Sequence, residues 1–477
     1  MRRLEPLAHS RKLVLRHGGH KQSHRHETVH LINLTRANEI GANCYLIEWD
    51  GLKLVLDAGL HPRLDGPAAL PDTSLLPPGE IDAFFVSHAH LDHVGSLPVL
   101  MRNQPEAHVL MTEPTGLLAD PLLHNAANVM HKRAEEGRDA VVRLFGHAEV
   151  SQSVKRWRSC PLERERALGD LRFQFFASGH ILGAAGIRIE GGGSTLFYTG
   201  DVNFRDQTLS RKAAFPHDRV DALIVETTRG AAPAPPDFSR KAELSRLAEK
   251  IRAVFERKGA ILMPAFALGK TQEAISAIHA MIRRDEIPEC PVFIGGLSWR
   301  LTALHDGLAD EYPRDLPKLR IIEHIGPRLL TGREIGSHRL IPGAIYLLSS
   351  GMMIERTLSN LLAQRMLAEE RHAIFFIGYC DPASPAGRLR AAHADGTRVE
   401  LDPRLGPQPI HCEVDHFELT AHALREDILE YILSVDPKHV VLVHGDPAAL
   451  EWFRGEIVGR RPTMRVTIPA PGARVPL

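Results

Sequence analysis

A short segment of the sequence concentrates side chains that bind metal ions. Residues 87–93 read Ser-His-Ala-His-Leu-Asp-His, directly after an apolar run. His88 and His90 are two positions apart and can face the same way on extended backbone, whereas Asp92 and His93 turn toward a second position nearby. Imidazole and carboxylate groups suit zinc or a similar divalent metal. This one loop could therefore hold two ions, one through each pair of side chains.

Neither pair completes the shell of a zinc ion, so further ligands must come from other parts of the chain. His180, Asp201 and His444 each stand beside a glycine at the end of an apolar run. Ligand sites in layered α/β proteins gather at the carboxyl ends of strands, so these three side chains are candidates for the missing positions. Asp57 ends another apolar run and is expected either to bind a metal or to orient a residue that does.

Short apolar runs predict the strands that position these residues. In the first half of the chain, Asp50-Gly51 and Gly191-Gly192-Gly193 are hairpin signals between such runs. The segment from about residue 115 to 168 is expected to be mostly helical. The predicted strands of this half are 44–49, 52–57, 81–86, 187–190 and 195–199.

The composition changes after Glu226. Residues 230–237 are rich in alanine and proline and are expected to form a loop or linker. Buried runs then alternate with helical segments, including a helix expected from about 270 to 284, and this alternation predicts a parallel sheet covered on both faces. The runs are 260–266, 291–294, 344–348 and 373–377, and a similar run recurs at 439–443.

The overall composition limits the classes of function. The 477 residues are 44% hydrophobic, enough for a sizeable core. Fifty-eight basic residues balance 58 acidic ones, so an anionic substrate must be met by a local patch or by metal. No apolar run approaches the roughly 18 residues of a membrane span, so no membrane partner is expected. Five scattered cysteines favour a reduced, cytoplasmic compartment.

Several motifs, in their order along the chain, resemble the metallo-β-lactamase superfamily. They are His88-Ala89-His90-Leu91-Asp92-His93, Leu56-Asp57-Ala58-Gly59, Gly179-His180-Ile181-Leu182-Gly183-Ala184 and Tyr198-Thr199-Gly200-Asp201. Further motifs resemble its β-CASP branch, which includes ribonuclease J, the nuclease subunit of the cleavage and polyadenylation machinery, and their prokaryotic relatives. These lie at 225–230, 264–270, 349–353, 420–422 and 442–445. The resemblance runs from about residue 29 to 455.

The resemblance implies an α/β fold, namely a metallo-β-lactamase αββα sandwich with an inserted parallel-sheet β-CASP domain. The expected parts are a His-rich extension at 1–27, the first part of the metallo-β-lactamase domain at 28–227, the inserted domain at 228–408 and the second part at 409–477.

The resemblance also implies a set of site residues. One zinc would be held by His88, His90 and His180, and the other by Asp92, His93 and His444, with Asp201 bridging and Asp57 supporting. Glu226 matches the first acidic motif of the branch, and His422 matches its later histidine, proposed as the general acid. A histidine at position 444 is typical of RNA-acting members, whereas DNA-acting members usually carry valine there.

The expected activity is hydrolysis of RNA phosphodiesters in RNA processing or decay, with two Zn²⁺ ions, or Mn²⁺ in their place. A bridging hydroxide would attack the phosphorus, with Asp92 among the catalytic residues. His422, oriented by Glu226, would protonate the 3′-oxygen that leaves. Endonucleolytic and 5′→3′ exonucleolytic action both stay open, and relatives suggest a homodimer.

Three further residues are expected to contact RNA: Lys270, at a helix N-terminus, Ser350 and Thr420. Tyr379, which follows another strand, either stacks on a base or packs in the core.

Two other readings compete with a ribonuclease. One is an enzyme of the same fold with another substrate, either a DNA nuclease or a lactonase or thioesterase. Glu226, His422 and the inserted region argue against small esters, because enzymes for such substrates lack that lid. The other is a non-catalytic subunit, whose usual mark is the loss of metal ligands, and here every ligand position is filled.

Overall fold

The computed structural model describes residues 5–6, 28–135, 142–235, 238–312 and 314–477. The chain divides into two compact units. The first unit comprises Met1–Arg205, Lys212–Ala234 and His422–Leu477, and the second comprises Asp206–Arg211 and Pro235–Ala421. Apart from residues 5–6, the expected His-rich extension at 1–27 lies outside the described residues.

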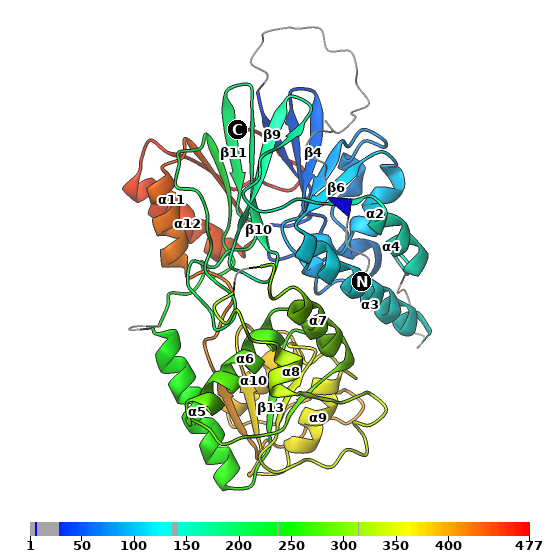
Figure 1. The fold of residues 1–477 in the computed structure, drawn as a ribbon, viewed down its shortest axis with the longest axis vertical. Coiled ribbons are helices and arrows are strands. Elements are labelled where there is room, and N and C mark those ends of the chain that lie inside the picture. Colours follow the sequence, from blue (N-terminus) through cyan, green and yellow to red (C-terminus); the bar gives the residue numbers. More distant parts are fainter. Residues whose placement is uncertain (1–4, 7–27, 136–141, 236–237, 313) are drawn as a thin grey trace. The chain divides into compact units, whose positions relative to one another are not determined.

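Two sheets form the centre of the first unit (Figure 1). In the described residues the first sheet has the order β1-β7-β6-β5-β4-β3-β2-β21. Its strands are β1 (Glu5–Pro6), β2 (His30–Asn33), β3 (Tyr45–Trp49), β4 (Leu52–Leu56), β5 (Ala83–Phe85), β6 (His108–Met111), β7 (Trp157–Ser159) and β21 (Arg474–Pro476). The second sheet, in the order β20-β19-β12-β11-β10-β9-β8, draws on both chain segments that flank the second unit. Its strands are β8 (Arg166–Leu168), β9 (Leu171–Ala177), β10 (Ala185–Gly191), β11 (Ser194–Tyr198), β12 (Ala222–Glu226), β19 (His439–Val443) and β20 (Arg465–Thr467).

The main core of this unit lies between its two sheets. Leu54 and Phe85 of the first sheet belong to the same buried cluster as Phe173, Ile187 and Val441 of the second. The outer face of the second sheet packs against α11 (Arg425–Val435) and α12 (Pro447–Arg460). Helices α2 (Leu97–Leu100), α3 (Glu113–Glu135) and α4 (His147–Val154) lie beside the first sheet (Figure 1). These four layers confirm the predicted αββα sandwich.

The remaining short helices of the first unit are α1 (Leu91–Val94) and the 3₁₀ turns η1 (Gly66–Ala69), η2 (Thr73–Leu75) and η3 (Met101–Asn103).

The two predicted hairpins are confirmed. Asp50 and Gly51 both have positive φ and join β3 to β4, whose register pairs Trp49 with Leu52. Gly192 and Gly193 join β10 to β11 in the same way. The expectation of a mostly helical segment from 115 to 168 is wrong at its end, where β7 and β8 form. Each strand is only three residues long. Pairing of β7 with β6 and of β8 with β9 determines their conformation, rather than any local sequence pattern.

The second unit is built on a parallel sheet. In the described residues its order is β15-β14-β16-β13-β17-β18, and every pair in it is parallel. The strands are β13 (Ile261–Pro264), β14 (Val292–Ile294), β15 (Arg328–Leu329), β16 (Ile345–Leu348), β17 (Ala373–Phe376) and β18 (Glu413–His416). The predicted parallel sheet is therefore present.

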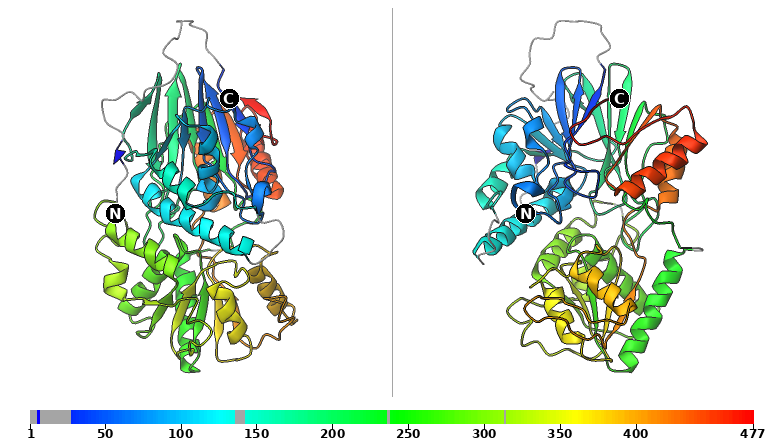
Figure 2. Two further views of the ribbon diagram at one scale, coloured as in Figure 1. Left: turned by 90° about the vertical axis from the view of Figure 1, so that its right-hand side faces the viewer. Right: turned by 180° about the vertical axis from the view of Figure 1, so that it is seen from behind.

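Helices cover both faces of this sheet (Figure 2). One face packs against α5 (Arg240–Glu256) and α6 (Lys270–Arg283), and the other against α9 (Leu358–Met366) and α10 (Pro385–Ala394). Near-continuous apolar strands such as β16 are the expected result, because neither face meets water. The unit also contains α7 (Gly296–Gly307) and α8 (Ile321–Ile325).

The limits of the second unit depend on two contacts. Glu273 of α6 accepts hydrogen bonds from the backbone N–H groups of Thr208, Leu209 and Ser210, which ties residues 206–211 to this unit. Strand β18, which follows the expected boundary at residue 408, pairs with β17 in the same sheet. Within the described part of the chain, no helix combines the length and apolarity that a bilayer crossing requires.

Candidate metal centre

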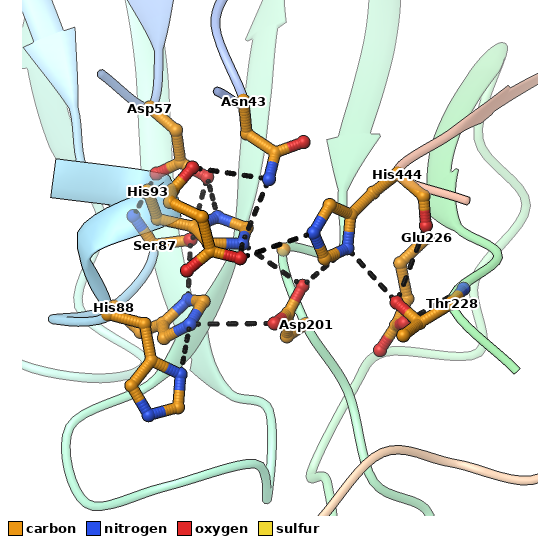
Figure 3. A network of polar contacts seen from close by, with 12 residues as sticks. Asn43, Asp57, Ser87, His88, His93, Asp201, Glu226, Thr228 and His444 are labelled. Atoms are coloured by element: carbon orange, nitrogen blue, oxygen red, sulfur yellow. Dashed lines mark hydrogen bonds and ion pairs between the residues drawn. The ribbon is translucent and has the colours of Figure 1, made fainter. Parts of the chain in front are cut away.

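The ends of five strands converge on one cluster of histidines and acids in the first unit (Figure 3). The loop after β5 carries His88 and His90, and α1, which follows at once, carries Asp92 and His93. The other members follow β9, β11 and β19 or end β12: His180, Asp201, His444 and Glu226. In the second sheet β9, β11, β12 and β19 run in the same direction, so their carboxyl ends share one edge.

One group of ligand atoms comprises nitrogens of three histidines and one carboxylate oxygen. Nδ1 of His90 lies 3.1 Å from Nε2 of His88 and 3.1 Å from Nε2 of His180. Oδ2 of Asp201 lies 3.5 Å from Nε2 of His88 and 3.6 Å from Nε2 of His180. In a tetrahedral zinc shell neighbouring ligand atoms are about 3.3 Å apart, because each is about 2.0–2.1 Å from the ion. The group therefore fits a zinc ion.

A second group lies on the other side of Asp201. Nε2 of His93 lies 3.8 Å from Oδ2 of Asp92, and Nε2 of His444 lies 3.5 Å from the same oxygen. Oδ1 of Asp201 is 3.3 Å from Nε2 of His93 and 3.1 Å from Nδ1 of His444. This group is looser than the first, but its donor types are those that bind divalent metals.

Asp201 thus turns one carboxylate oxygen to each group. Its Oδ2 faces His88 and His180, whereas its Oδ1 faces His93 and His444. Oδ1 of Asp201 and Nε2 of His444 are both buried, and neither has a hydrogen-bond partner among the described residues. Buried polar atoms normally have partners, and a cation is a natural partner for these two. The side chains therefore fit a pair of metal ions that shares one carboxylate.

Asp57 lies behind the second group and orients it. The carboxylate is fully buried, and its Oδ2 lies 2.7 Å from Nδ1 of His93. It also accepts hydrogen bonds from the backbone N–H and hydroxyl of Ser87 and from the hydroxyl of Tyr198. A proton held on Nδ1 of His93 leaves the lone pair on Nε2, the atom that faces Asp201. Asp57 thus contacts His93 from behind rather than belonging to either group of candidate ligands.

Four polar partners of the cluster were not predicted from the sequence. Besides Ser87 and Tyr198, they are Asn43, whose amide nitrogen lies 3.1 Å from Nε2 of His93, and Thr228, whose hydroxyl lies 3.0 Å from Nδ1 of His444. Asn43 precedes β3, and Thr228 follows β12 by two residues. A polar residue just beyond a buried strand was the available signal, but many residues share that position.

His422 and Glu226 form a pair beside the first group. Nδ1 of His422 lies 3.3 Å from both carboxylate oxygens of the buried Glu226. The backbone N–H of Val202 donates to Glu226 Oε1 at 2.7 Å and fixes that carboxylate. The opposite ring atom, Nε2, lies 3.9 Å from Asp201 Oδ2. One nitrogen of the imidazole is therefore held by an acid while the other points toward the metal groups.

Burial and the charges of neighbouring groups together set the protonation of the cluster. Burial lowers the pKa of His88 well below its usual value, and the charge of His93 adds to this. Burial also opposes charge on Asp201, yet His93 and His444 hold its pKa well below the usual range. Burial disfavours the imidazolium of His422, but Glu226 and Asp201 outweigh it and raise the pKa. The pocket therefore favours a concentration of positive charge around Asp201, which metal ions would supply.

The three expected RNA contacts lie in the second unit. The ammonium group of Lys270, the first residue of α6, donates to the carbonyl of Leu419, which precedes Thr420. Ser350 follows β16, and its hydroxyl accepts from the backbone N–H of Ile354 at 3.0 Å. Their role in binding RNA stays a prediction.

Family models match most of the chain. The model of the metallo-beta-lactamase superfamily matches residues 37–253, and the Beta-Casp domain matches residues 271–389. The chain therefore has a metallo-β-lactamase domain and a Beta-Casp domain. A third model, described as a Zn-dependent metallo-hydrolase RNA specificity domain, matches residues 407–469. The superfamily and its β-CASP domain are those that the sequence motifs predicted.

Curated relatives match over most of the length of this chain. The Drosophila melanogaster protein "Cleavage and polyadenylation specificity factor 73" is 28% identical over 422 residues, which cover 87% of this chain and 59% of the relative. "Endoribonuclease YSH1" of Saccharomyces cerevisiae is 26% identical over 452 residues, with coverage of 92% and 57%. The chain thus spans less than two thirds of the length of these relatives.

A solved structure of a protein of unknown function from Enterococcus faecalis V583 has the same fold, with a TM-score of 0.54 and 13% identity over 94% of this chain and all of that one.

Proposed function

We propose that this chain is a zinc-dependent ribonuclease that holds two ions and hydrolyses RNA phosphodiesters. The observation that carries the proposal is the position of Asp201, each of whose carboxylate oxygens faces a different group of histidines. When bound, two such ions polarise a phosphodiester and make hydroxide available from water near neutral pH. The ligands would be His88, His90 and His180 for one ion and Asp92, His93 and His444 for the other, with Asp201 shared.

The residues around the ligands would set the protonation and the orientation of those ligands. Asp57 holds the proton of His93 on Nδ1, so that Nε2 is free to act as a ligand. Thr228 lies 3.0 Å from Nδ1 of His444, which restrains the ring. Ser87 and Tyr198 fix Asp57 in turn. This network keeps the ligands in place, which is what a repeated hydrolytic cycle requires.

His422 would act as the general acid. Glu226 accepts from its Nδ1–H, so Nε2 is the atom that can pass a proton to the 3′-oxygen that leaves. Burial lowers the pKa of His422, but the carboxylate of Glu226 raises it, which favours the protonated ring that this role needs. General acid catalysis of this kind contributes about 10²–10⁴-fold to the rate.

Three observations support RNA as the substrate. The third family model is described by RNA specificity, and it includes His444, the position at which RNA-acting members carry histidine. Several curated relatives are named endoribonucleases. We therefore propose that the chain cleaves RNA internally.

The test is digestion of 5′-labelled RNA, matched DNA and a panel of lactones, together with metal analysis. We expect RNA cleavage that leaves 5′-phosphate ends and about two zinc ions per chain. Asp92→Ala should lose one ion and the activity. The side chain of Asp218 is 82% exposed, so Asp218→Ala should keep both ions and the full activity.

Other results would replace this proposal. Faster turnover of DNA or of a lactone would indicate another substrate class, and metal binding without turnover of any substrate would indicate a non-catalytic subunit. If the metal analysis found manganese instead of zinc, only the identity of the proposed metal would change. A homodimer and a cytoplasmic location stay predictions, which size-exclusion chromatography and cell fractionation can test.

A further inference from the structure

Two aromatic side chains of the second unit are unusually exposed. Phe266 is 43% exposed and Tyr379 is 55% exposed. The other exposed large hydrophobic side chains in the described part of the chain are all aliphatic. Burial of an aromatic ring is strongly favourable, so a fold that leaves two of them in water gives up stabilisation at both positions. Where exposed apolar side chains lie near one another, they can mark a binding surface.

Phe266 and Tyr379 follow neighbouring strands at the same edge of the sheet. Phe266 lies two residues beyond the end of β13, and Tyr379 lies three residues beyond the end of β17. These strands pair in parallel, with Leu262 opposite Ile374, so both segments leave the sheet at its carboxyl edge. Paired strands are about 4.8 Å apart, which places the two segments within the span of a few nucleotides.

The backbone at both positions is held in place. The carbonyl of Phe266 accepts hydrogen bonds from the N–H and hydroxyl of Thr271. A side chain at Gly351 would come within 3.1 Å of the backbone nitrogen of Phe266, so the loop after β16 packs closely there. Gly378, just before Tyr379, has a φ of 136°, which favours glycine. The two rings are thus presented by fixed backbone rather than by a loose loop.

A positive charge lies beside Gly378, the residue before Tyr379. Lys270 is the first residue of α6, and its ammonium group would be 3.4 Å from a side chain at Gly378. The N-terminus of α6, a helix of 14 residues, adds a partial positive charge. Exposed rings next to a cation and a helix N-terminus are the combination that binds single-stranded nucleic acid, since bases stack on the rings and phosphates meet the charge.

We propose that Phe266 and Tyr379 form a stacking platform for unpaired bases of the RNA substrate. The inference rests on the proposed ribonuclease function and names part of its substrate site. A base inside a duplex is covered on both faces by its neighbours, so the platform selects single-stranded RNA. It has little sequence preference, because every base offers a π face.

Replacing the rings by leucine tests the platform while keeping apolar bulk. With the full-length, metal-loaded protein, Phe266→Leu and Tyr379→Leu should each raise KM for single-stranded RNA by about 5- to 150-fold and leave kcat within about threefold. Phe266→Tyr and Tyr379→Phe keep a ring and should restore KM. Leu329→Ala removes an exposed aliphatic side chain of the same unit and should change neither constant.

A series of RNAs, each with one abasic position, separates stacking from other contacts. For the wild-type protein, one or two abasic positions should raise KM, and the Phe266→Leu/Tyr379→Leu double variant should show no further loss there. Two results would overturn the platform even if the wild type cleaves RNA. One is that the abasic position and the double variant raise KM independently of each other, and the other is that KM is unchanged in the double variant. A wild-type protein that cleaves no RNA would instead overturn the proposed function and the platform with it.

Discussion

Replacing Asp57 by asparagine should weaken metal binding although Asp57 is not itself expected to touch an ion. The exchange keeps the shape of the side chain but puts an NH₂ group in place of one oxygen. If that group takes the Oδ2 position, it faces the hydroxyls of Ser87 and Tyr198 and Nδ1 of His93, all within 2.6–2.8 Å. The hydroxyls can turn and accept. Nδ1 can accept only after its proton has moved to Nε2, the atom that faces Asp201.

The size of the effect follows from this tautomer change. A proton on Nε2 removes the lone pair that a metal needs, and loss of such a supporting partner typically costs 10–100-fold in metal affinity, or about 1.4–2.7 kcal/mol. The opposite amide orientation places NH₂ against the backbone N–H of Ser87, at the 2.7 Å now spanned by a hydrogen bond. Two buried donors facing one another would cost about 1–3 kcal/mol of folding free energy. Either orientation is therefore unfavourable.

The assay is competition for zinc with a chromophoric chelator, read for both ions. We expect Asp57→Asn to lower the affinity for one zinc ion by about 10–100-fold and to leave the affinity for the other nearly unchanged. Tyr198→Phe is the matched control, because it removes one hydrogen bond to Asp57 without disturbing the proton on His93. It should change metal affinity less than threefold. If Asp57→Asn bound both ions as tightly as the wild type, the orienting role of Asp57 would be wrong.

Three further predictions concern other parts of the chain. His422→Ala should lower kcat on RNA by about 10²–10⁴-fold with the metal content unchanged, and turnover within a few-fold of wild type would rule out the acid role. Burial and Arg465 lower the pKa of His439 to about 4, so between pH 6.5 and 4 the unfolded chain binds a proton that the folded chain does not. This histidine therefore costs up to about 1.4 kcal/mol of stability per pH unit as pH falls through that window, and denaturant titrations at pH 7 and 5 should show a weaker pH dependence in His439→Asn. Glu273→Ala leaves three backbone N–H groups of residues 208–210 without their acceptor and should cost at least about 2 kcal/mol in denaturant unfolding, whereas the exposed Glu249→Ala should cost almost nothing.

The fold could be predicted where local pattern and tertiary environment agree. Strands such as β16 are apolar at every position, which is the pattern of a strand covered on both faces. The turns at Asp50-Gly51 and Gly192-Gly193 need positive φ and have the residues that supply it. Strands β7 and β8 escaped prediction because three residues carry too little periodicity, and partners distant in the sequence determine their conformation.

The candidate site also contains some residues that the sequence could predict and others that it could not. His88, His90, Asp92 and His93 stand together in the sequence, so their proximity needed no fold to be seen. His180, Asp201 and His444 required only the rule that parallel strands end at one edge. Asn43 and Thr228 could not be found in this way, because their contacts with His93 and His444 span 50 and 216 positions along the chain. Polar residues of this kind are common, and only the packed structure distinguishes these two.

The course of the chain through the two sheets has a consequence for synthesis on the ribosome. Strand β19 pairs with β12, and β21 pairs with β2, so both sheets of the first unit require residues made after the second unit. All strands of the second unit in the described residues are made once residue 416 has emerged. We therefore expect the inserted part to fold while the surrounding part still waits, with its hydrophobic sheet faces open to chaperones until the last strands arrive.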